Sequence, residues 1–167
     1  MKQQLTWGVI AVVLACGSYA SRVIATPGQN FTPTTIAKGT FDEIDLQTHT
    51  IPAFWNAQLR TKGLSDLYVQ SNEWQPGGTT GWHTHPGLSL VIVTEGMVTA
   101  YEGDDPGCAP HVYQQGMSFV DVVNGHTHVL RNESSVVART VAVQLIPAAA
   151  VRRIDAPHPD NCPASIN

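Results

Sequence analysis

Charged residues are scarce in this sequence of 167 residues. Asp, Glu, Lys and Arg together make up only 13%, well below the roughly one quarter that soluble proteins usually carry. The formal net charge is −4, and Lys and Arg are not clustered anywhere. This composition argues against a nucleic-acid partner. The lack of a basic amphipathic stretch argues against attachment to a membrane surface.

Several sequence devices of catalysis are also missing. The chain has no Gly-x-Ser-x-Gly elbow, no phosphate-binding glycine loop and no dinucleotide fingerprint. No apolar run reaches the roughly 20 residues that cross a bilayer, so we expect no transmembrane domain in the mature chain. Hydrophobic residues make up 43%, enough for one folded domain. What remains open is a small-molecule ligand, a metal ion or another protein.

The N-terminus resembles an export signal. Lys2 provides a positive charge, Leu5–Ala15 is an uncharged and mostly apolar run, and small residues end at Ala20. We expect cleavage after Ala20, or alternatively after Ala25, and an exported protein, periplasmic or secreted. A lipoprotein signal ending before Cys16 is a second interpretation, in which lipidated Cys16 anchors the chain to a membrane. An uncleaved N-terminal anchor is a third.

The cysteines agree with export. The chain has three, and both processing routes remove or modify Cys16. Cys108 and Cys162 remain, each in a turn-like stretch, and in an oxidising compartment such a pair is expected to form a disulfide. Two unpaired thiols are the alternative.

Short β-like segments follow one another over most of the chain. Alternation of polar and apolar residues, or runs rich in Val and Leu bounded by Gly and Pro, predict strands. The predicted strands are 43–47, 57–60, 66–70, 88–94, 97–101, 117–123, 126–131 and 136–145, with turns at 77–81 and 95–96. The expected division is a signal at 1–20, a linker at 21–40, an all-β barrel at 41–155 and a tail at 156–167.

Histidines form two pairs, His83-Thr84-His85 and His126-Thr127-His128. Residues two apart in a strand point to the same face, so each pair presents two imidazoles on one side. Neutral imidazole is a frequent ligand of zinc, copper, iron and nickel. The spacing therefore indicates a metal site.

The segment from Gly77 to Asn132 resembles the two-motif core of the cupin superfamily. The matching residues of the first motif are Gly77, His83, His85 and Gly96, and those of the second are Gly116, Gly125, His128 and Asn132. Two departures stand out: Ser89 occupies the position of the usual metal-binding Glu, and the second motif has one inserted residue and lacks its Pro.

The resemblance implies an all-β, single cupin barrel, that is, a double-stranded β-helix or jelly roll. It implies His83, His85 and His128 as ligands of a divalent transition metal such as Fe, Mn, Ni or Zn. With Ser89 in place of Glu, the set resembles the three-His variants, among them the thiol and diketone dioxygenases. Neutral ligands leave the metal its +2 charge, which favours an anionic substrate. His126 is a candidate fourth ligand, or else a base or gate at the barrel mouth.

Three functions remain open at this point. The first is a metal-dependent enzyme of dioxygenase, decarboxylase or isomerase type acting on a small anionic molecule. The second is a non-catalytic protein of the cell envelope that binds a metal or a small ligand. The third is an unmetallated structural barrel. Cupin barrels often pair through their outer strands, so the resemblance also implies a homodimer. Gln144, in the last long strand, is a candidate inward polar contact.

Overall fold

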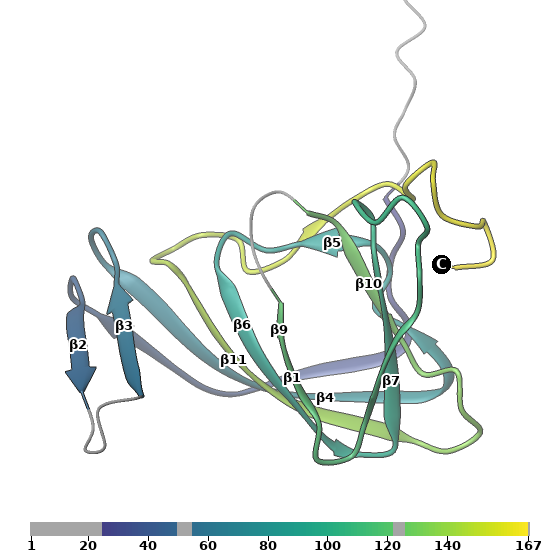
Figure 1. Ribbon diagram of the computed structural model, residues 1–167, viewed down its shortest axis with the longest axis horizontal. Coiled ribbons are helices and arrows are strands. Elements are labelled where there is room, and N and C mark those ends of the chain that lie inside the picture. Colours follow the sequence, from purple (N-terminus) through teal and green to yellow (C-terminus); the bar gives the residue numbers. More distant parts are fainter. Residues whose placement is uncertain (1–24, 50–54, 122–125, 167) are drawn as a thin grey trace, which may run out of the picture.

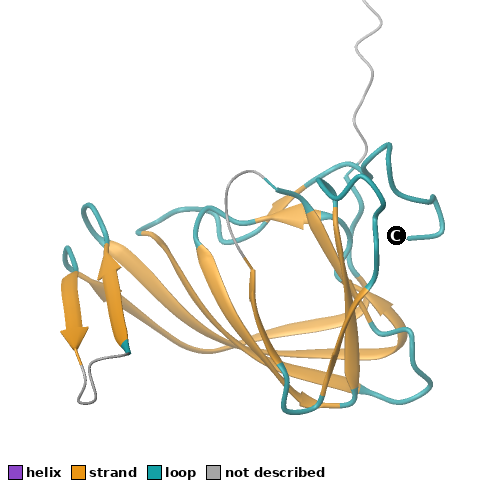
Figure 2. Ribbon diagram, in the orientation of Figure 1, coloured by secondary structure: helices purple, strands orange, loops and turns teal. Residues whose placement is uncertain are grey.

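The computed structural model describes residues 25–49, 55–121 and 126–166. These residues form strands, turns and loops and contain no helix (Figure 2). The predicted all-β class is therefore confirmed. Over the same residues, nothing resembles a helix long and apolar enough to cross a membrane. The predicted export signal, with Cys16, lies outside the described residues.

The described residues contain strands of very different lengths. Their bounds are β1 Gln29–Phe41, β2 Asp45–His49, β3 Asn56–Arg60, β4 Ser65–Thr79, β5 His83–Thr84, β6 Leu88–Glu95, β7 Met97–Glu102, β8 His111–Gln114, β9 Ser118–Asp121, β10 His128–Arg131, β11 Ala138–Pro147 and β12 Ile154–Asp155.

One antiparallel sheet holds all the strands except β2 and β3. Its order runs β12-β5-β10-β4-β11-β6-β9. In addition β1 pairs with β4, and β7 pairs with both β10 and β8. The sheet curls into a nearly closed barrel, whereas β2 and β3 form a separate hairpin that projects from one end (Figure 1). Strands that close on one another leave few unpaired edges and enclose a core.

The inward faces follow the two-residue period of the strands. Along β11 the residues alternate between buried and half-buried without interruption until the last one. Part of the interior is filled by an apolar cluster of Trp74, Val93, Val98, Ala100, Leu130 and Ala138. The remaining interior carries polar side chains.

The predicted linker at 21–40 is wrong, because most of it is β1. This strand pairs with β4 from Gln29 to Phe41. The segment contains Pro33 and Gly39, which suggested a linker. Both are tolerated here because β1 has a partner on one side only, and an edge strand does not need every backbone N–H. The barrel therefore begins before the predicted residue 41.

Other boundaries also differ. Gly77 and Gly78 belong to β4 rather than to a turn, and the strand predicted at 126–131 begins only at His128. The short strands β5, β8 and β12 were not predicted, because two to four residues give too little pattern to read.

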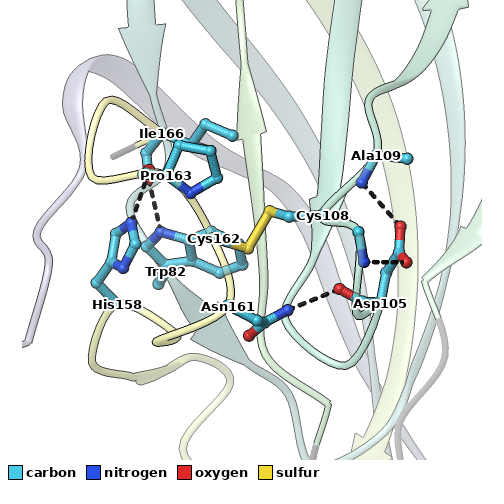
Figure 3. Close-up of a disulfide and its surroundings, with 10 residues drawn as sticks. Trp82, Asp105, Cys108, Ala109, His158, Asn161, Cys162, Pro163 and Ile166 are labelled. Atoms are coloured by element: carbon cyan, nitrogen blue, oxygen red, sulfur yellow. Dashed lines mark hydrogen bonds between the residues drawn. A yellow bond between two sulfur atoms is a disulfide. The ribbon is translucent and has the colours of Figure 1, made fainter.

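The C-terminal tail is tied to the outside of the barrel. The predicted disulfide is present: Cys108 and Cys162 are 54 residues apart in sequence and their Cα atoms are 5.3 Å apart. Beneath it lies Trp82, which is fully buried and donates from Nε1 to the carbonyl oxygen of Ile166 over 2.9 Å (Figure 3). The disulfide, Trp82 and the tail thus form a second, outer apolar cluster.

The loop that carries Cys108 is held by Asp105. The Asp105 carboxylate accepts hydrogen bonds from the backbone N–H groups of Gly107, at 2.9 Å, and Ala109, at 2.8 Å. Its backbone carbonyl accepts from Nδ2 of Asn161 in the tail, at 2.6 Å (Figure 3). These N–H donors, that of Ala109 first, lower the pKa of Asp105. The loop therefore has a fixed shape at the point where the tail attaches.

Candidate metal centre

Three histidines come together inside the barrel. His83 opens β5 and His128 opens β10, and the two are direct partners in the antiparallel register. Such partners share a face, and the ring centroids of His83 and His128 are 4.3 Å apart. His85, two residues beyond His83, points the same way. One nitrogen from each of the three rings lies within 4.8 Å of the other two.

Backbone carbonyls fix the orientation of two of these rings. Nδ1 of His83 lies 2.8 Å from the carbonyl oxygen of Gly81, and Nδ1 of His85 lies 2.8 Å from that of Arg152. A carbonyl oxygen only accepts hydrogen bonds, so Nδ1 carries the proton in both rings and, in the neutral ring, Nε2 keeps its lone pair. Metal-binding histidines usually make this arrangement.

Burial keeps two of the imidazoles, those of His83 and His128, neutral. The pKa of His83 is well below its usual value, mainly because the ring is buried and secondarily because of the charges of His128, Arg153 and His85. Burial also lowers the pKa of His128 to about 4, against an opposing contribution from Asp121. Neutral rings at pH 7 have lone pairs available for a cation.

An unpaired nitrogen of His128 indicates that a metal fits this site. Its Nε2 is buried and has no hydrogen-bond partner among the described residues, although such an atom normally finds one. The atom lies within the cluster formed with His83 and His85. A divalent transition metal would satisfy it, and three imidazoles are a suitable donor set.

Sequence reasoning missed Asp121, Arg152 and Arg153, and of these Asp121 lies against the histidines. Its Oδ2 lies 3.3 Å from Nε2 of His85 and 3.3 Å from Nε2 of His128, and its side chain is only 12% exposed. Asp121 ends β9, where it is the direct partner of Ser89 on β6. Ser89 is itself buried and faces the same cavity.

A local signal for Asp121 did exist. Phe119 packs against the apolar cluster of the interior, and Asp121 lies two residues further along the same strand. An aromatic residue and an acid in alternation indicate that both face inward. The identity of the residue opposite Asp121 depends on the pairing of β6 with β9, which the sequence does not reveal.

His126 does not join the cluster. Its side chain is 40% exposed and its Nδ1 contacts the carboxylate of Asp104. It precedes β10 and lies in a loop, where the alternation that places His128 inward does not operate. Glu95 likewise stays outside, since it pairs with Arg139 at the exposed end of β6.

The cavity in front of the histidines has apolar walls and several polar groups. Its lining comprises Phe31, Pro33, Trp74, Val91, Leu130 and Ala142 as apolar residues, and Gln70, Asn72, Thr80, His83, His85, Ser89, Asp121, His128, Gln144, Arg152 and Arg153 as polar ones. Gln144, the candidate inward polar contact, is 2% exposed and faces this space. Its Oε1 is buried without a partner.

Two adjacent arginines bring positive charge to the cavity. Arg153 donates from Nε to Asp155 over 2.7 Å, while its Nη2 is buried and unpaired among the described residues. Burial is the main cause that lowers the pKa of both Arg152 and Arg153, yet a guanidinium remains charged at neutral pH. The unpaired Nη2 is suited to an anionic oxygen.

Comparison by sequence identifies no relative: no family model matches this sequence, and no curated protein sequence matches it. Comparison by structure identifies proteins of similar fold. The polyketide cyclase RemF from Streptomyces resistomycificus superposes with a TM-score of 0.51 at 14% identity, over 83% of this chain and 82% of RemF.

Two further structures are similar over smaller parts. The Cnp3 cupin domain from Schizosaccharomyces pombe has a TM-score of 0.41 at 9% identity, over 62% of this chain and 87% of that domain. An oxalate oxidase has a TM-score of 0.42 at 22% identity, over 49% of this chain. This chain spans only 46% of the length of the oxalate oxidase.

The fold can now be identified from three observations. The antiparallel sheet curls into a nearly closed barrel. The two histidine-bearing strands meet in register inside it. RemF shares the architecture over most of both chains. The chain thus has the cupin fold.

Proposed function

We propose that this protein is a metal-dependent enzyme acting on a small anionic molecule. The observation that carries the proposal is the convergence of His83, His85 and His128 within 4.8 Å, with Nε2 of His128 buried and unpaired. Iron, nickel and zinc suit imidazole ligands, whereas manganese prefers oxygen ligands such as a carboxylate. When bound, such an ion supplies Lewis acidity, and iron in addition supplies dioxygen chemistry.

The residues around the histidines support an anionic substrate. Arg152 and Arg153 would bind a carboxylate or enolate oxygen, and the unpaired Nη2 of Arg153 is the group best placed to donate to it. Oε1 of Gln144 would accept from a substrate hydroxyl. Phe31 and Val91 would exclude water from the apolar part of the molecule.

The polarity of the lining favours an enzyme over a passive binding protein. Besides the three histidines, the lining includes the ionisable residues Asp121, Arg152 and Arg153. Sites that only store a ligand need few such groups, whereas proton transfer and charge stabilisation require them. The reaction classes in keeping with this set are oxidation, decarboxylation and isomerisation.

The test is elemental analysis of the protein purified without an affinity tag. We expect about one equivalent of a transition metal in the native protein and none in the His83→Ala/His85→Ala variant. His111→Ala, which removes an exposed histidine of β8, is the matched control and should keep the metal. Absence of metal from the native protein, even after reconstitution, would leave an unmetallated barrel and end the proposal.

A second measurement separates catalysis from binding. If metal is present but candidate small carboxylates are neither oxidised, decarboxylated nor isomerised, the non-catalytic function remains. Metal binding itself should raise thermal stability, because a ligand that binds only the folded state stabilises it by about 2.7 kcal/mol at a hundred times its Kd.

We also propose that the protein is exported. The disulfide between Cys108 and Cys162 supports this, since such bonds persist in oxidising compartments. Fractionation of cells expressing the full chain should recover a shortened protein outside the cytoplasm. Recovery in a membrane fraction that depends on Cys16 would favour the lipoprotein alternative.

A further inference from the structure

We propose that Asp121 is the acidic ligand of the metal, supplied from the strand beside the one that carries it in the cupin motif. In that motif a Glu occupies the position of Ser89. Here the carboxylate would reach the metal from β9 instead of β6. The inference rests on the proposed function, because it requires a metal at His83, His85 and His128.

The strand register makes the exchange possible. Ser89 and Asp121 are direct partners in the antiparallel pair of β6 and β9. Side chains at directly opposed positions share one face, with Cβ atoms about 4.5–5.5 Å apart. A carboxylate at either position therefore enters the same cavity, and both residues are among those that line it.

The contacts of Asp121 are those of a ligand without its cation. Nδ1 of His85 gives its proton to the carbonyl of Arg152, so in the neutral ring Nε2 presents a lone pair to the Asp121 oxygen 3.3 Å away. Nε2 of His128 is at the same distance from that oxygen and forms no hydrogen bond. A cation held between the Asp121 oxygen and these two ring nitrogens would attract all three atoms.

No other described carboxylate competes for this role. Among the described residues, Asp121 is the one Asp or Glu that lines the cavity. The Ser89 hydroxyl is a weak ligand for a divalent cation. Asp121 would also lower the net charge of a divalent site from +2 to +1, which leaves Arg152 and Arg153 as the groups that attract an anionic substrate.

A metal-free explanation exists and can be tested. In that explanation the Asp121 carboxylate would only hold the rings of His85 and His128 in their orientation by direct contact. In that case the carboxylate would be effective only at position 121, and moving it to position 89 would not restore its role. A ligand carboxylate, in contrast, can be moved to the opposing position without loss of the metal.

The experiment measures Co²⁺ binding to the chelator-treated full chain, by calorimetry and by the visible absorption of the bound ion. Asp121→Asn should weaken Co²⁺ binding by more than about a hundredfold, beyond the 10–100-fold typical for a residue that only supports a ligand, and should change the absorption spectrum. Asp104→Asn, which removes an exposed carboxylate that contacts His126, is the matched control and should do neither.

The decisive variant exchanges the two positions. Ser89→Glu/Asp121→Ser should recover most of the Co²⁺ affinity and a spectrum close to the native one. If the native protein binds Co²⁺ and Asp121→Asn binds it equally well with the same spectrum, Asp121 is not a ligand, although the three-histidine site stands. Failure of the exchanged variant to recover affinity, in a protein with native circular dichroism, would likewise overturn the inference. Failure of the native protein to bind Co²⁺ would overturn the proposed function as well.

Discussion

The two sides of β5 differ in whether their buried polar groups have hydrogen-bond partners. Trp82, just before the strand, faces outward, and its indole N–H is paired with the tail beneath a disulfide. His83, the next residue, faces the cavity. Of the five buried side-chain atoms without a partner among the described residues, four belong to cavity-lining residues: Trp74, His128, Gln144 and Arg153.

This difference separates structure from function within one barrel. Buried polar atoms are nearly always paired, and leaving one unpaired costs about 1–3 kcal/mol. The outer cluster obeys that rule and is closed covalently. The inner cavity breaks it repeatedly, and a metal ion with an anionic molecule would satisfy several of these atoms at once. Unpaired groups gathered around one space indicate a ligand site more strongly than any single residue does.

The largest change in stability should come from removing the disulfide on the outside of the barrel. Cys108→Ser/Cys162→Ser is expected to lower the free energy of unfolding by about 2–4 kcal/mol, the usual contribution of such a bond. Because the cavity histidines keep their own backbone contacts, the folded variant should still bind Co²⁺. Urea denaturation with calorimetry checks both points. An unchanged unfolding midpoint would show that the tail does not close the barrel.

A smaller change in stability, of opposite sign, is expected when an unpaired polar group inside the cavity is replaced. Gln144→Met replaces the buried, unpaired Oε1 with an apolar chain of similar length, so the metal-free protein should gain up to about 1 kcal/mol of stability. The matched control is Gln70→Met: Gln70 is equally buried but donates to Thr35 over 2.7 Å, so this change should cost about 1 kcal/mol. Equal losses in both variants would show that the unpaired Oε1 of Gln144 does not destabilise the metal-free protein.

The smallest change in stability should appear only at acidic pH. It concerns Asp66, a buried carboxylate that is fully hydrogen-bonded. Asp66 binds Lys38 Nζ at 2.8 Å, Thr40 Oγ1 at 2.6 Å and the N–H of Ala149 at 3.1 Å. The hydrogen bond from Lys38 is the main cause that lowers the pKa of Asp66 to about 2 from 3.8.

A pKa lower in the folded state than in the unfolded one stabilises the protein above the unfolded value. The contribution of Asp66 is therefore complete above about pH 4 and disappears as the pH falls to about 2. Unfolding midpoints in urea across this range should decline in the native protein, and less so in Asp66→Asn. Parallel declines in the two proteins would mean that other carboxylates dominate acid unfolding.

The sequence predicts the barrel and the three histidines of its site through local patterns. The spacing of His83 and His85 places both rings on one face, and the second motif identifies His128. Glycine turns and alternating strands identify the fold class. Each of these patterns extends over a few residues, and the period of a strand is enough to interpret it.

The remainder depends on pairing between distant segments. Asp121 matters because β9 lies beside β6 in a register that sets it opposite Ser89. β1 is a strand because β4 is long enough to pair with it. His126 turns away because the chain is still in a loop at that point, although its spacing from His128 is that of His83 from His85. No local pattern contains these facts.

The register of His83 with His128 has a consequence for the rates of folding and unfolding. These partners are 45 positions apart in the sequence, so their rings meet only after the segment between them has folded and brought β5 and β10 together. An ion held by both would bind late, after most of the barrel had formed. Such an interaction slows unfolding and leaves the folding rate almost unchanged. The metal-loaded protein would then be kinetically stable because it unfolds slowly.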